Sequence, residues 1–442
     1  MDWSKLPDLA VVTLLACAFA SAARRSQSSV SSLWLTGWMM IVVQFAAFLF
    51  APAAGQFGTI VEFIGLASLA WAGILFIWAS IPYRGNSSSF WMMSALLGTN
   101  TLYIAVLVFS PAVYWALTLA AALFGALPLA ITLLNLHRDN HGLRWVKVVL
   151  YASLSIFLMA FQFRPGSGLH IALNAVFFTI FFTCGIHFFH AYRRATTGAF
   201  ITISGFVAWA SVFVLGSGVG GFMRDLPRES EVWNLPKFVV AVGMILLLLE
   251  EQIEHNKYLA LHDELTGLPN RRLFQDRLAS ALEHARRNKS SAALLVVDLD
   301  RFKQVNDAHG HHVGDQLLNH VGKIISSRIR RSDTVARTGG DEFSVILHEP
   351  ASREDAANIG DTLIELLTEP VVLGNQTIRI GASVGIAVFQ EDAPDGEGLC
   401  IVADKRMYDY KNSVGSPERA PRPAMPSLIP QSELTADLRQ AG

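Results

Sequence analysis

Residues 335–347, Val-Ala-Arg-Thr-Gly-Gly-Asp-Glu-Phe-Ser-Val-Ile-Leu, decide the fold of the C-terminal part of this chain. Val335 to Arg337 predicts the end of one strand, and Val345 to Leu347 predicts a second, buried strand. Between them Gly339-Gly340 predicts a tight hairpin, because glycine accepts positive φ at no steric cost. Asp341-Glu342 follows at once. Carboxylates on a rigid turn suit a divalent metal, and the glycines let a phosphate approach the backbone. The alternative is an ordinary hairpin with a solvated acidic edge.

The composition divides the chain in two. Hydrophobic residues make up 52% of the 442 residues and charged residues 16%. Up to about residue 249 the chain is mostly apolar, and after that it is rich in charged residues. A net charge of -1 does not favour nucleic acid as a partner. The cysteines lie far apart, so neither a disulfide framework nor a Cys-x-x-Cys metal site is indicated: Cys17, Cys184 and Cys400.

The first half predicts an all-α polytopic membrane bundle of about nine spans, because a bilayer core needs roughly 20 apolar residues per helix. The candidate spans are 7–23, 32–54, 58–81, 90–110, 111–136, 145–163, 168–191, 198–218 and 236–250. The first lacks a basic n-region and a cleavage site, so we interpret it as a retained segment. Lys and Arg concentrate in alternate loops, which places the N-terminus outside and the C-terminal half in the cytoplasm. The boundary at Ser110-Pro111 is the weakest, which leaves eight or nine spans open.

A few polar residues lie within these predicted spans. Glu62 would face the bundle or be protonated, since a charge at the bilayer centre is costly. His187 and His190, spaced i, i+3, suit either a metal or haem site or, in our preferred interpretation, the membrane interface. We interpret three asparagines as interhelical hydrogen-bonding groups rather than a transport path: Asn100, Asn135 and Asn174.

The last span predicts a helix that leaves the membrane without a break, since no Gly or Pro interrupts residues 251–262. Apolar residues fall near heptad spacing with one polar position on the same seam, which fits a short parallel coiled coil, and a plain helical linker is the alternative. The seam residues are Leu246, Leu249, Ile253, Asn256 and Ala260.

The second half predicts an α+β domain. Residues 261–275 indicate a turn and a helix, and the continuous apolar run 292–298 indicates a buried strand that ends in Asp298-Leu299-Asp300. An acid at the end of a central strand, facing a second acid on a hairpin, is the usual arrangement for Mg²⁺ on a triphosphate. Later elements are expected as helices 315–331, 352–369 and 399–412 and strands within 377–389. We expect four segments: transmembrane region 1–250, connector 251–262, α+β domain 263–415 and disordered tail 416–442.

Five ordered motifs carry a family resemblance. They are the run 263–272, the run from Asp298 to Asp315, the run from Arg337 to Phe343, Ser383 to Ala387, and Ala403 to Tyr408. Residues 261–412 resemble a GGDEF domain of the diguanylate cyclase family. The resemblance implies a palm-like nucleotidyl cyclase fold and the condensation of two GTP into cyclic di-GMP and two pyrophosphates, in the bacterial inner membrane.

The resemblance also implies roles for single residues. Asp298 and Asp341 would bind Mg²⁺ or Mn²⁺ through their carboxylates, and Leu299 through its carbonyl. Lys303 would neutralise charge on the transferring phosphate. Glu342 would act as the base at the ribose 3′-hydroxyl, with Asp341 as the alternative base. The nucleotide-binding residues would be Asn306 and Asp315 at guanine, His311 nearby, and Gly339 and Gly340 at the turn.

The C-terminal helix departs from the family pattern, which has Lys-x-x-Gly followed by a second basic residue. Lys411 is present and would reach a phosphate, whereas the segment through Gly415 has one extra residue and lacks the second basic group. Arg406 is only a weak substitute. No EAL-type hydrolase follows in the sequence, so breakdown of cyclic di-GMP is not expected.

Arg330 and Asp333 resemble the family's RxxD product-inhibition site, since Asp333 lies six residues before Gly339. A surface Arg–Asp pair at a helix end is the alternative. The resemblance further implies a homodimer, because each active site holds one GTP and the product joins two. Besides the lipid bilayer, the expected partners are GTP and cyclic di-GMP. Two other classes stay open: a catalytically silent nucleotide-binding receptor, and a transporter with a regulatory domain.

Overall fold

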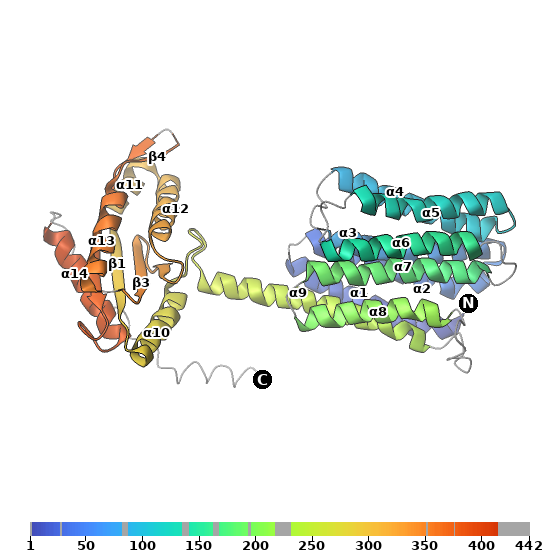
Figure 1. Ribbon diagram of the computed structural model, residues 1–442, viewed down its shortest axis with the longest axis horizontal. Coiled ribbons are helices and arrows are strands. Elements are labelled where there is room, and N and C mark those ends of the chain that lie inside the picture. Colours follow the sequence, from blue (N-terminus) through green and yellow to red (C-terminus); the bar gives the residue numbers. More distant parts are fainter. Residues whose placement is uncertain are drawn as a thin grey trace. The chain divides into compact units, whose positions relative to one another are not determined.

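The computed structural model describes residues 2–26, 29–81, 87–134, 141–161, 168–192, 196–216, 231–350, 352–374 and 376–413. The chain divides into two compact units, Met1–Glu254 and His255–Gly442 (Figure 1). The first is helical and the second combines helices with a sheet. Most of the charged loop residues that determine the predicted topology lie outside the described residues, as do the tail 416–442 and Asn135.

The first unit contains nine long helices among its described residues. Their bounds are α1 Leu6–Ser26, α2 Ser29–Phe50, α3 Gly58–Ala79, α4 Ser87–Phe109, α5 Tyr114–Leu134, α6 His141–Phe161, α7 Gly168–Ala191, α8 Thr197–Gly216 and α9 Leu235–Leu261. Within the described residues seven helices, α1–α5, α7 and α8, are long and apolar enough to cross a membrane. The predicted count of about nine spans is therefore not confirmed. In α6 the apolar part is shorter, Trp145–Ala160, and in α9 it is limited by Lys237 and Glu250.

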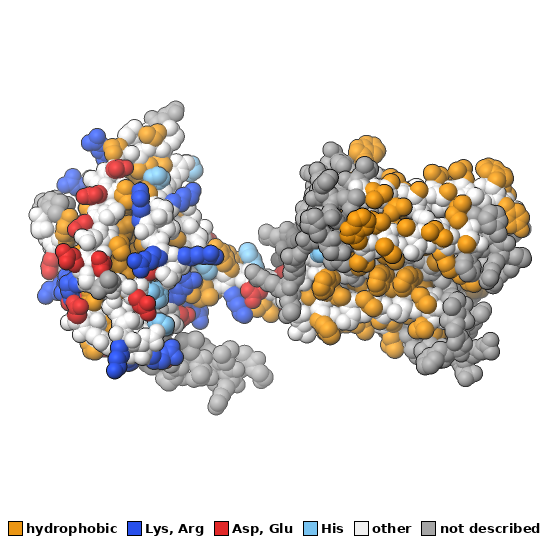
Figure 2. Space-filling view, in the orientation of Figure 1, with side chains coloured by type: hydrophobic (Ala, Val, Ile, Leu, Met, Phe, Trp, Pro, Cys, Tyr) orange, Lys and Arg blue, Asp and Glu red, His pale blue; other side chains and the backbone are white. Residues whose placement is uncertain are grey.

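Large apolar side chains cover the outside of this helical unit as well as its interior. Leu14, Trp115 and Phe200 are more than 70% exposed, and Figure 2 shows apolar side chains spread over the visible face of these helices. Inside, aromatic rings stack closely, with the centroids of Phe181 and Trp209 3.8 Å apart. A bundle that is apolar inside and outside fits a lipid environment better than water.

Glu62 does not face the bundle, which was the first of the two expected alternatives. Its side chain is exposed, and α3 begins at Gly58, so Glu62 lies in the second turn of the helix. This position is near the helix end rather than at its middle, where a charge would be most costly.

The last helix packs unusually closely against α8. A Cβ on Gly243 of α9 would lie 2.7 Å from the backbone nitrogen and 2.9 Å from the Cα of Thr202. At the end of the same contact, Gly198 donates its backbone N–H to Glu250 Oε1 over 3.1 Å. From this contact α9 continues without interruption to Leu261, which confirms the predicted continuity of the helix. The side chains of Leu249 and Ile253 on the proposed heptad seam are 42% and 53% exposed.

The glycine contact between α8 and α9 leads to a stability prediction. Gly243→Ala should lower the melting temperature of the full chain, because overpacking against immobile backbone costs about 1–3 kcal/mol. Gly98→Ala on α4 is the matched control, since a Cβ there meets no atom within 4 Å. Differential scanning calorimetry in nanodiscs measures both variants. Equal melting temperatures for the two would contradict the close contact.

The second unit is built on a four-stranded sheet in the order β2-β3-β1-β6. The strands are β1 Ala292–Asp300, β2 Thr334–Arg337, β3 Glu342–His348 and β6 Gly381–Val388, and β1 is antiparallel to both β3 and β6. A separate two-stranded ribbon pairs β4 Val371–Leu373 with β5 Gln376–Ile378. This arrangement confirms the predicted α+β class.

Helices cover both faces of the sheet, which explains why β1 is a continuous apolar run. Leu295 and Val297 face a core with α12 and α13, whereas Leu294 and Val296 face a core with α10 and α14. The helices are α10 Arg271–Asn288, α11 Phe302–His309, α12 His311–Arg328, α13 Arg353–Thr368 and α14 Gly396–Ser413. Because side chains alternate along a strand, each face receives every second residue.

Several predicted helix boundaries are wrong. The helix expected over 315–331 spans His311–Arg328, because Gly310 takes φ +83° and ends α11 there. The last helix begins at Gly396 rather than 399. The strands expected within 377–389 are β5 and β6, which residues 379–380 separate.

Candidate active site

The end of β1 and the β2–β3 hairpin meet at one place in the sheet. Asp298 is 3% exposed and is paired in register with Glu342 on β3. The backbone N–H of Leu299 donates to the carbonyl of Asp341 over 3.2 Å. The antiparallel pairing of β1 and β3 therefore brings together the predicted metal ligands Asp298, Leu299 and Asp341, with Glu342 beside them.

The hairpin forms where the sequence predicts it, but the stated reason for its glycines is wrong. Neither Gly339 nor Gly340 has positive φ. A Cβ on Gly339 would lie 2.6 Å from Glu342 Oε2, so a larger residue would displace the Glu342 carboxylate. A Cβ on Gly340 would meet no atom within 4 Å, so the protein itself leaves that side of the turn open. The turn is closed by the N–H groups of Thr338 and Gly339, which both donate to the carbonyl of Glu342.

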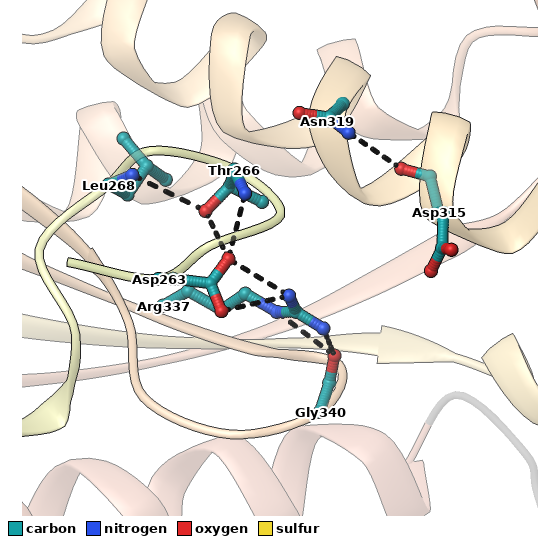
Figure 3. A network of polar contacts seen from close by, with 7 residues as sticks. All are labelled: Asp263, Thr266, Leu268, Asp315, Asn319, Arg337 and Gly340. Carbon is teal, nitrogen blue, oxygen red and sulfur yellow. Dashed lines mark hydrogen bonds and ion pairs between the residues drawn. The ribbon is translucent and has the colours of Figure 1, made fainter. Parts of the chain in front are cut away.

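Arg337 holds the turn in place, a role that the sequence analysis did not assign. Its Nη1 donates to both carboxylate oxygens of Asp263, at 3.0 and 3.1 Å, and its Nη2 donates to the carbonyl of Gly340 at 2.8 Å (Figure 3). The Arg337 side chain is 13% exposed. The signal in the sequence was a lone arginine two positions before the glycine pair. Its acidic partner lies 74 positions away.

Asp263 is itself fixed by its own turn. Thr266 donates to Asp263 Oδ1 through its backbone N–H at 2.8 Å and its hydroxyl at 2.7 Å. Burial raises the pKa of Asp263, but the hydrogen bonds from Thr266 and Arg337 outweigh burial and hold this pKa below its usual value of 3.8. The turn 263–266 therefore fixes the carboxylate that holds Arg337 beside the hairpin.

Lys411 of α14 contacts the acidic strand end. Its ammonium forms an ion pair with Asp298 Oδ1 and lies 3.8 Å from Asp300 Oδ1. Ser383 on β6 donates to the same Asp300 oxygen at 2.8 Å. The sequence assigned Lys411 to a phosphate, whereas in the structure its cation lies at the carboxylate expected to bind metal.

The oxygen ligands at this place suit a hard divalent cation. Two carboxylates and a carbonyl are ligands that Mg²⁺ accepts, with waters and substrate phosphates completing its shell. The ammonium of Lys411 beside Asp298 shows that this carboxylate accepts a cation. Among the described residues no three His, Cys, Asp or Glu side chains converge as a metal site, so a cation here would depend on the carbonyl and on its substrate. His187 and His190 likewise form no such group.

The predicted guanine-binding residues lie on α11 and α12, which pack against each other. Asn306 Oδ1 is buried and has no hydrogen-bond partner. It lies directly over Gly314, where a Cβ would approach to 1.9 Å. Asp315, one residue on, is exposed, and in Figure 3 its carboxylate points away from Asn319, which donates to its backbone carbonyl. An unsatisfied buried acceptor is costly without a ligand donor.

Lys303 and His311 are exposed at the same helix pair. A cleft of about 560 Å³ opens beside α11 and the end of β1. Its lining includes Asp300 and Lys411 together with two arginines that the sequence analysis did not single out, Arg301 and Arg379. Arg406 instead pairs with Asp392, with Nη2 2.8 Å from Oδ1. Its guanidinium therefore already has an acidic partner outside the cleft.

Arg330 and Asp333 form a turn between α12 and β2. Asp333 accepts from the backbone N–H groups of Arg330 and His348, both at 3.0 Å, and its side chain is 4% exposed. The Arg330 side chain is exposed. Asp333 therefore shapes the turn, and Arg330 is the member of the pair that faces solvent.

These features define a two-unit protein, an apolar helical half followed by an α+β domain with an acidic, cation-accepting strand end. Residues 260–416 match the family described as diguanylate cyclase, GGDEF domain, so this part of the chain is a GGDEF domain. The helical half has no family model of its own.

Two curated relatives come from Pseudomonas aeruginosa. The bifunctional diguanylate cyclase/cyclic di-GMP phosphodiesterase MucR is 38% identical over 221 residues, which cover 46% of this chain and 32% of MucR. Diguanylate cyclase TpbB is 40% identical over 161 residues, which cover 36% of this chain and 37% of TpbB. The match thus spans about a third of each relative. The solved GGDEF domain of TpbB is 41% identical with a TM-score of 0.34 and covers 34% of this chain and 89% of that one.

The Arg337–Asp263 contact leads to a prediction. Asp263→Asn should lower the free energy of unfolding of the GGDEF domain by about 1.5–3 kcal/mol at neutral pH, because a charge-assisted pair is lost. Glu264→Gln, an exposed neighbour, is the control. Urea unfolding of the full chain followed by pulse proteolysis measures both.

The pH dependence of this effect follows from the lowered pKa. The stabilisation is present above the usual value of 3.8 and is lost as the pH falls through the lower pKa of the folded state. The difference between wild type and Asp263→Asn should therefore shrink below about pH 3.8. A difference that persists at lower pH would mean that the charge of Asp263 is not responsible.

Proposed function

We propose that this protein is a membrane-bound diguanylate cyclase that condenses two GTP into cyclic di-GMP and two pyrophosphates. The observation that carries the proposal is the meeting of Asp298, Leu299 and Asp341 at the end of β1, beside an open glycine turn. The GGDEF relatives support it. In each of two steps a ribose 3′-hydroxyl attacks the α-phosphate of the other nucleotide, a new P–O bond forms, and pyrophosphate leaves.

Asp298, Asp341 and the carbonyl of Leu299 would hold Mg²⁺ or Mn²⁺. When bound, the metal neutralises charge on the triphosphate and its leaving pyrophosphate. Glu342, held against Gly339, would accept the 3′-hydroxyl proton, with Asp341 as the alternative base. Lys303 would stabilise charge on the transferring phosphate. When the nucleotide binds, the Lys411 ammonium would leave Asp298 and pair with a phosphate instead.

Guanine selection would depend on Asn306. Its buried Oδ1 has no partner within the protein, and guanine presents N–H donors where adenine presents an acceptor. Asp315 and His311 lie on the neighbouring helix and complete this side of the site. A site whose acceptor is left unpaired rejects the wrong base strongly.

The second phosphate contact would come from the cleft beside α11. The C-terminal helix lacks the family's second basic residue, and Arg301 and Arg379 line the same cleft as Lys411. Arginine suits this role because its planar fork binds phosphate oxygens in pairs.

A homodimer would form the complete reaction centre, because each GGDEF domain holds one of the two nucleotides. Pairing the domains raises the effective concentration of one nucleotide against the other. The exposed Leu249 and Ile253 on α9 support a coiled-coil contact between two copies.

We further infer a multi-pass protein of the bacterial inner membrane, with the N-terminus outside and the GGDEF domain in the cytoplasm, whose helical half controls synthesis as a sensor. The seven apolar helices support membrane insertion. A catalytically silent receptor is the second candidate. It is disfavoured because Asp298, Asp341 and both turn glycines are all present.

The assignment of the metal acids has a direct test. Asp341→Ala in the full chain should abolish conversion of GTP to cyclic di-GMP while leaving the melting temperature unchanged. Asp361→Ala, an exposed aspartate on α13, should behave as wild type. Chromatographic quantification of cyclic di-GMP with Mg²⁺ and with Mn²⁺ measures turnover. Full activity of the Asp341 variant would overturn the assignment, and an inactive wild type that still binds GTP would favour the silent receptor.

Product inhibition would act through the turn formed by Arg330 and Asp333. The exposed guanidinium of Arg330 can bind a guanine edge or a phosphate of cyclic di-GMP, while the buried carboxylate of Asp333 holds its backbone in place. The distance of this pair from the glycine turn matches the family's inhibitory site.

Arg330→Ala should leave the initial velocity near wild type and remove the slowing that accompanies product accumulation. Arg331→Ala, the exposed neighbour, is the control and should keep the slowing. Progress curves with and without added micromolar cyclic di-GMP measure the effect. If wild-type curves stay linear with product added, no inhibitory site operates in this protein.

A further inference from the structure

The cleft beside α11 is larger than a contact to one phosphate group requires. It has a volume of about 560 Å³ and is lined by residues of α11 and of the segment 377–381. Sites for small organic ligands have volumes of roughly 300–1,000 Å³. The lining includes the buried apolar side chains of Val305, Ile378 and Ile380, which are 9%, 3% and 5% exposed. The cleft therefore suits an organic phosphate rather than a phosphate ion alone.

The end of the cleft next to β1 is positively charged. Gly381 pairs with Asp300 in the ladder between β1 and β6, so Arg379, two residues before Gly381, lies at the same end as Arg301. Lys411 lines the cleft as well, but carboxylates of β1 already match its charge. Among the described residues the two guanidinium groups have no hydrogen bond or ion pair. They suit a phosphate group, because guanidinium forks bind phosphate oxygens in pairs.

The backbone at Arg301 supports a role in ligand binding. Arg301 takes φ +57° and ψ +26°, in the left-handed region, and its side chain does not cap α11 although it stands directly before that helix. This conformation costs free energy for a residue other than glycine, and strained residues of this kind cluster at ligand sites. Within the described part of the chain, neither capping nor ion pairing gives the guanidinium a structural role.

Farther along α11 the cleft carries groups that can contact a base. Gln304 and His309 line it together with Arg301, because positions 301, 304, 305 and 309 share one face of a helix. His309 lies eight residues after Arg301, about 12 Å along the helix axis. Neither the Gln304 amide nor the His309 ring has a partner among the residues that the structure describes. A glutamine amide pairs with adenine N6 and N7 through two hydrogen bonds, and an imidazole ring stacks on a base.

The cleft lies on a different side of α11 from the proposed guanine-binding residue. Asn306 faces Gly314 of α12, where a Cβ would lie 1.9 Å from its Oδ1, and it does not line the cleft. At 3.6 residues per turn, Asn306 is rotated by about 140° around the helix axis from Arg301. One short helix therefore separates the proposed guanine side from the cleft.

We propose that this cleft is a second nucleotide site, which binds an adenine nucleotide. The phosphates lie between Arg301 and Arg379, the adenine edge pairs with Gln304, and the ring stacks on His309 over the apolar lining. Binding to the cleft does not depend on the cyclase activity and is measured directly.

Occupation of the cleft regulates synthesis, and this consequence rests on the proposed function. Arg301 and Arg379 are also the proposed second phosphate contact for GTP, so an adenine nucleotide in the cleft competes with GTP for them. ADP should therefore raise the apparent KM for GTP and leave kcat unchanged.

Isothermal titration calorimetry of the full chain in nanodiscs tests the binding with four probes. ADP carries every required group, UDP lacks the adenine edge, ribose 5-phosphate lacks the base, and adenosine lacks the phosphates. ADP should bind at least about tenfold more tightly than each of the other three, because each of them leaves part of the site unpaired.

Variants locate the binding. Arg379→Met should weaken ADP binding by at least about tenfold. Gln304→Leu should weaken ADP binding while leaving the binding of ribose 5-phosphate unchanged. Arg272→Met is the matched control, since Arg272 is an exposed arginine on α10 that does not line the cleft. Asn306→Ala should bind ADP as wild type does, because Asn306 lies on the other side of α11.

Several results would overturn the proposal. They are the absence of ADP binding to wild type, UDP binding as tight as that of ADP, and unchanged ADP binding in both Arg379→Met and Gln304→Leu. Loss of ADP binding in Asn306→Ala would place ADP in the GTP site and reject the cleft. ADP binding by a wild type that makes no cyclic di-GMP would uphold the second site and reject the proposed cyclase, whereas synthesis without ADP binding would do the reverse.

Discussion

The register of β1 against β3 is the constraint on which the rest of the GGDEF domain depends. It places Asp298 opposite Glu342 and the backbone of Leu299 next to Asp341. A slip of one residue would turn every side chain of a strand to the opposite face. Two separate cores, one on each face of the sheet, hold the register, because both faces of β1 are buried. Packing energy therefore fixes the geometry of the acidic site.

The glycine turn is positioned from outside the hairpin. Arg337 joins the carboxylate of Asp263 to the carbonyl of Gly340, so one side chain links the first motif of the domain to the turn. This contact explains why the run 263–266 belongs to the signature although it carries no group expected to touch the nucleotide. A guanidinium with its donors in a planar fork can bridge the two partners, whereas a lysine ammonium lacks that geometry.

The Lys411 ammonium and the proposed metal ion would compete for one carboxylate at the end of β1. Lys411 contacts Asp298 in the structure, and the same carboxylate is the proposed metal ligand. Exchange of one cation for another keeps the buried acid compensated throughout, which avoids the cost of an uncompensated charge. The nearby arginines of the cleft can then meet the phosphates that accompany the metal.

The order of residues is enough to predict the division into an apolar and a charged half, the α+β class, the strand and hairpin positions and the family resemblance. These follow from local patterns, such as the continuous apolar run before Asp298 and the glycine pair before Asp341. Other features appear only once the chain is folded: that the Glu342 carboxylate lies against Gly339, what Arg337 holds, that Lys411 contacts Asp298, and that Asn100, Lys147 and His187 line one cavity. The physical reason is that such contacts join residues distant in the chain, and their partners are chosen by packing rather than by local periodicity.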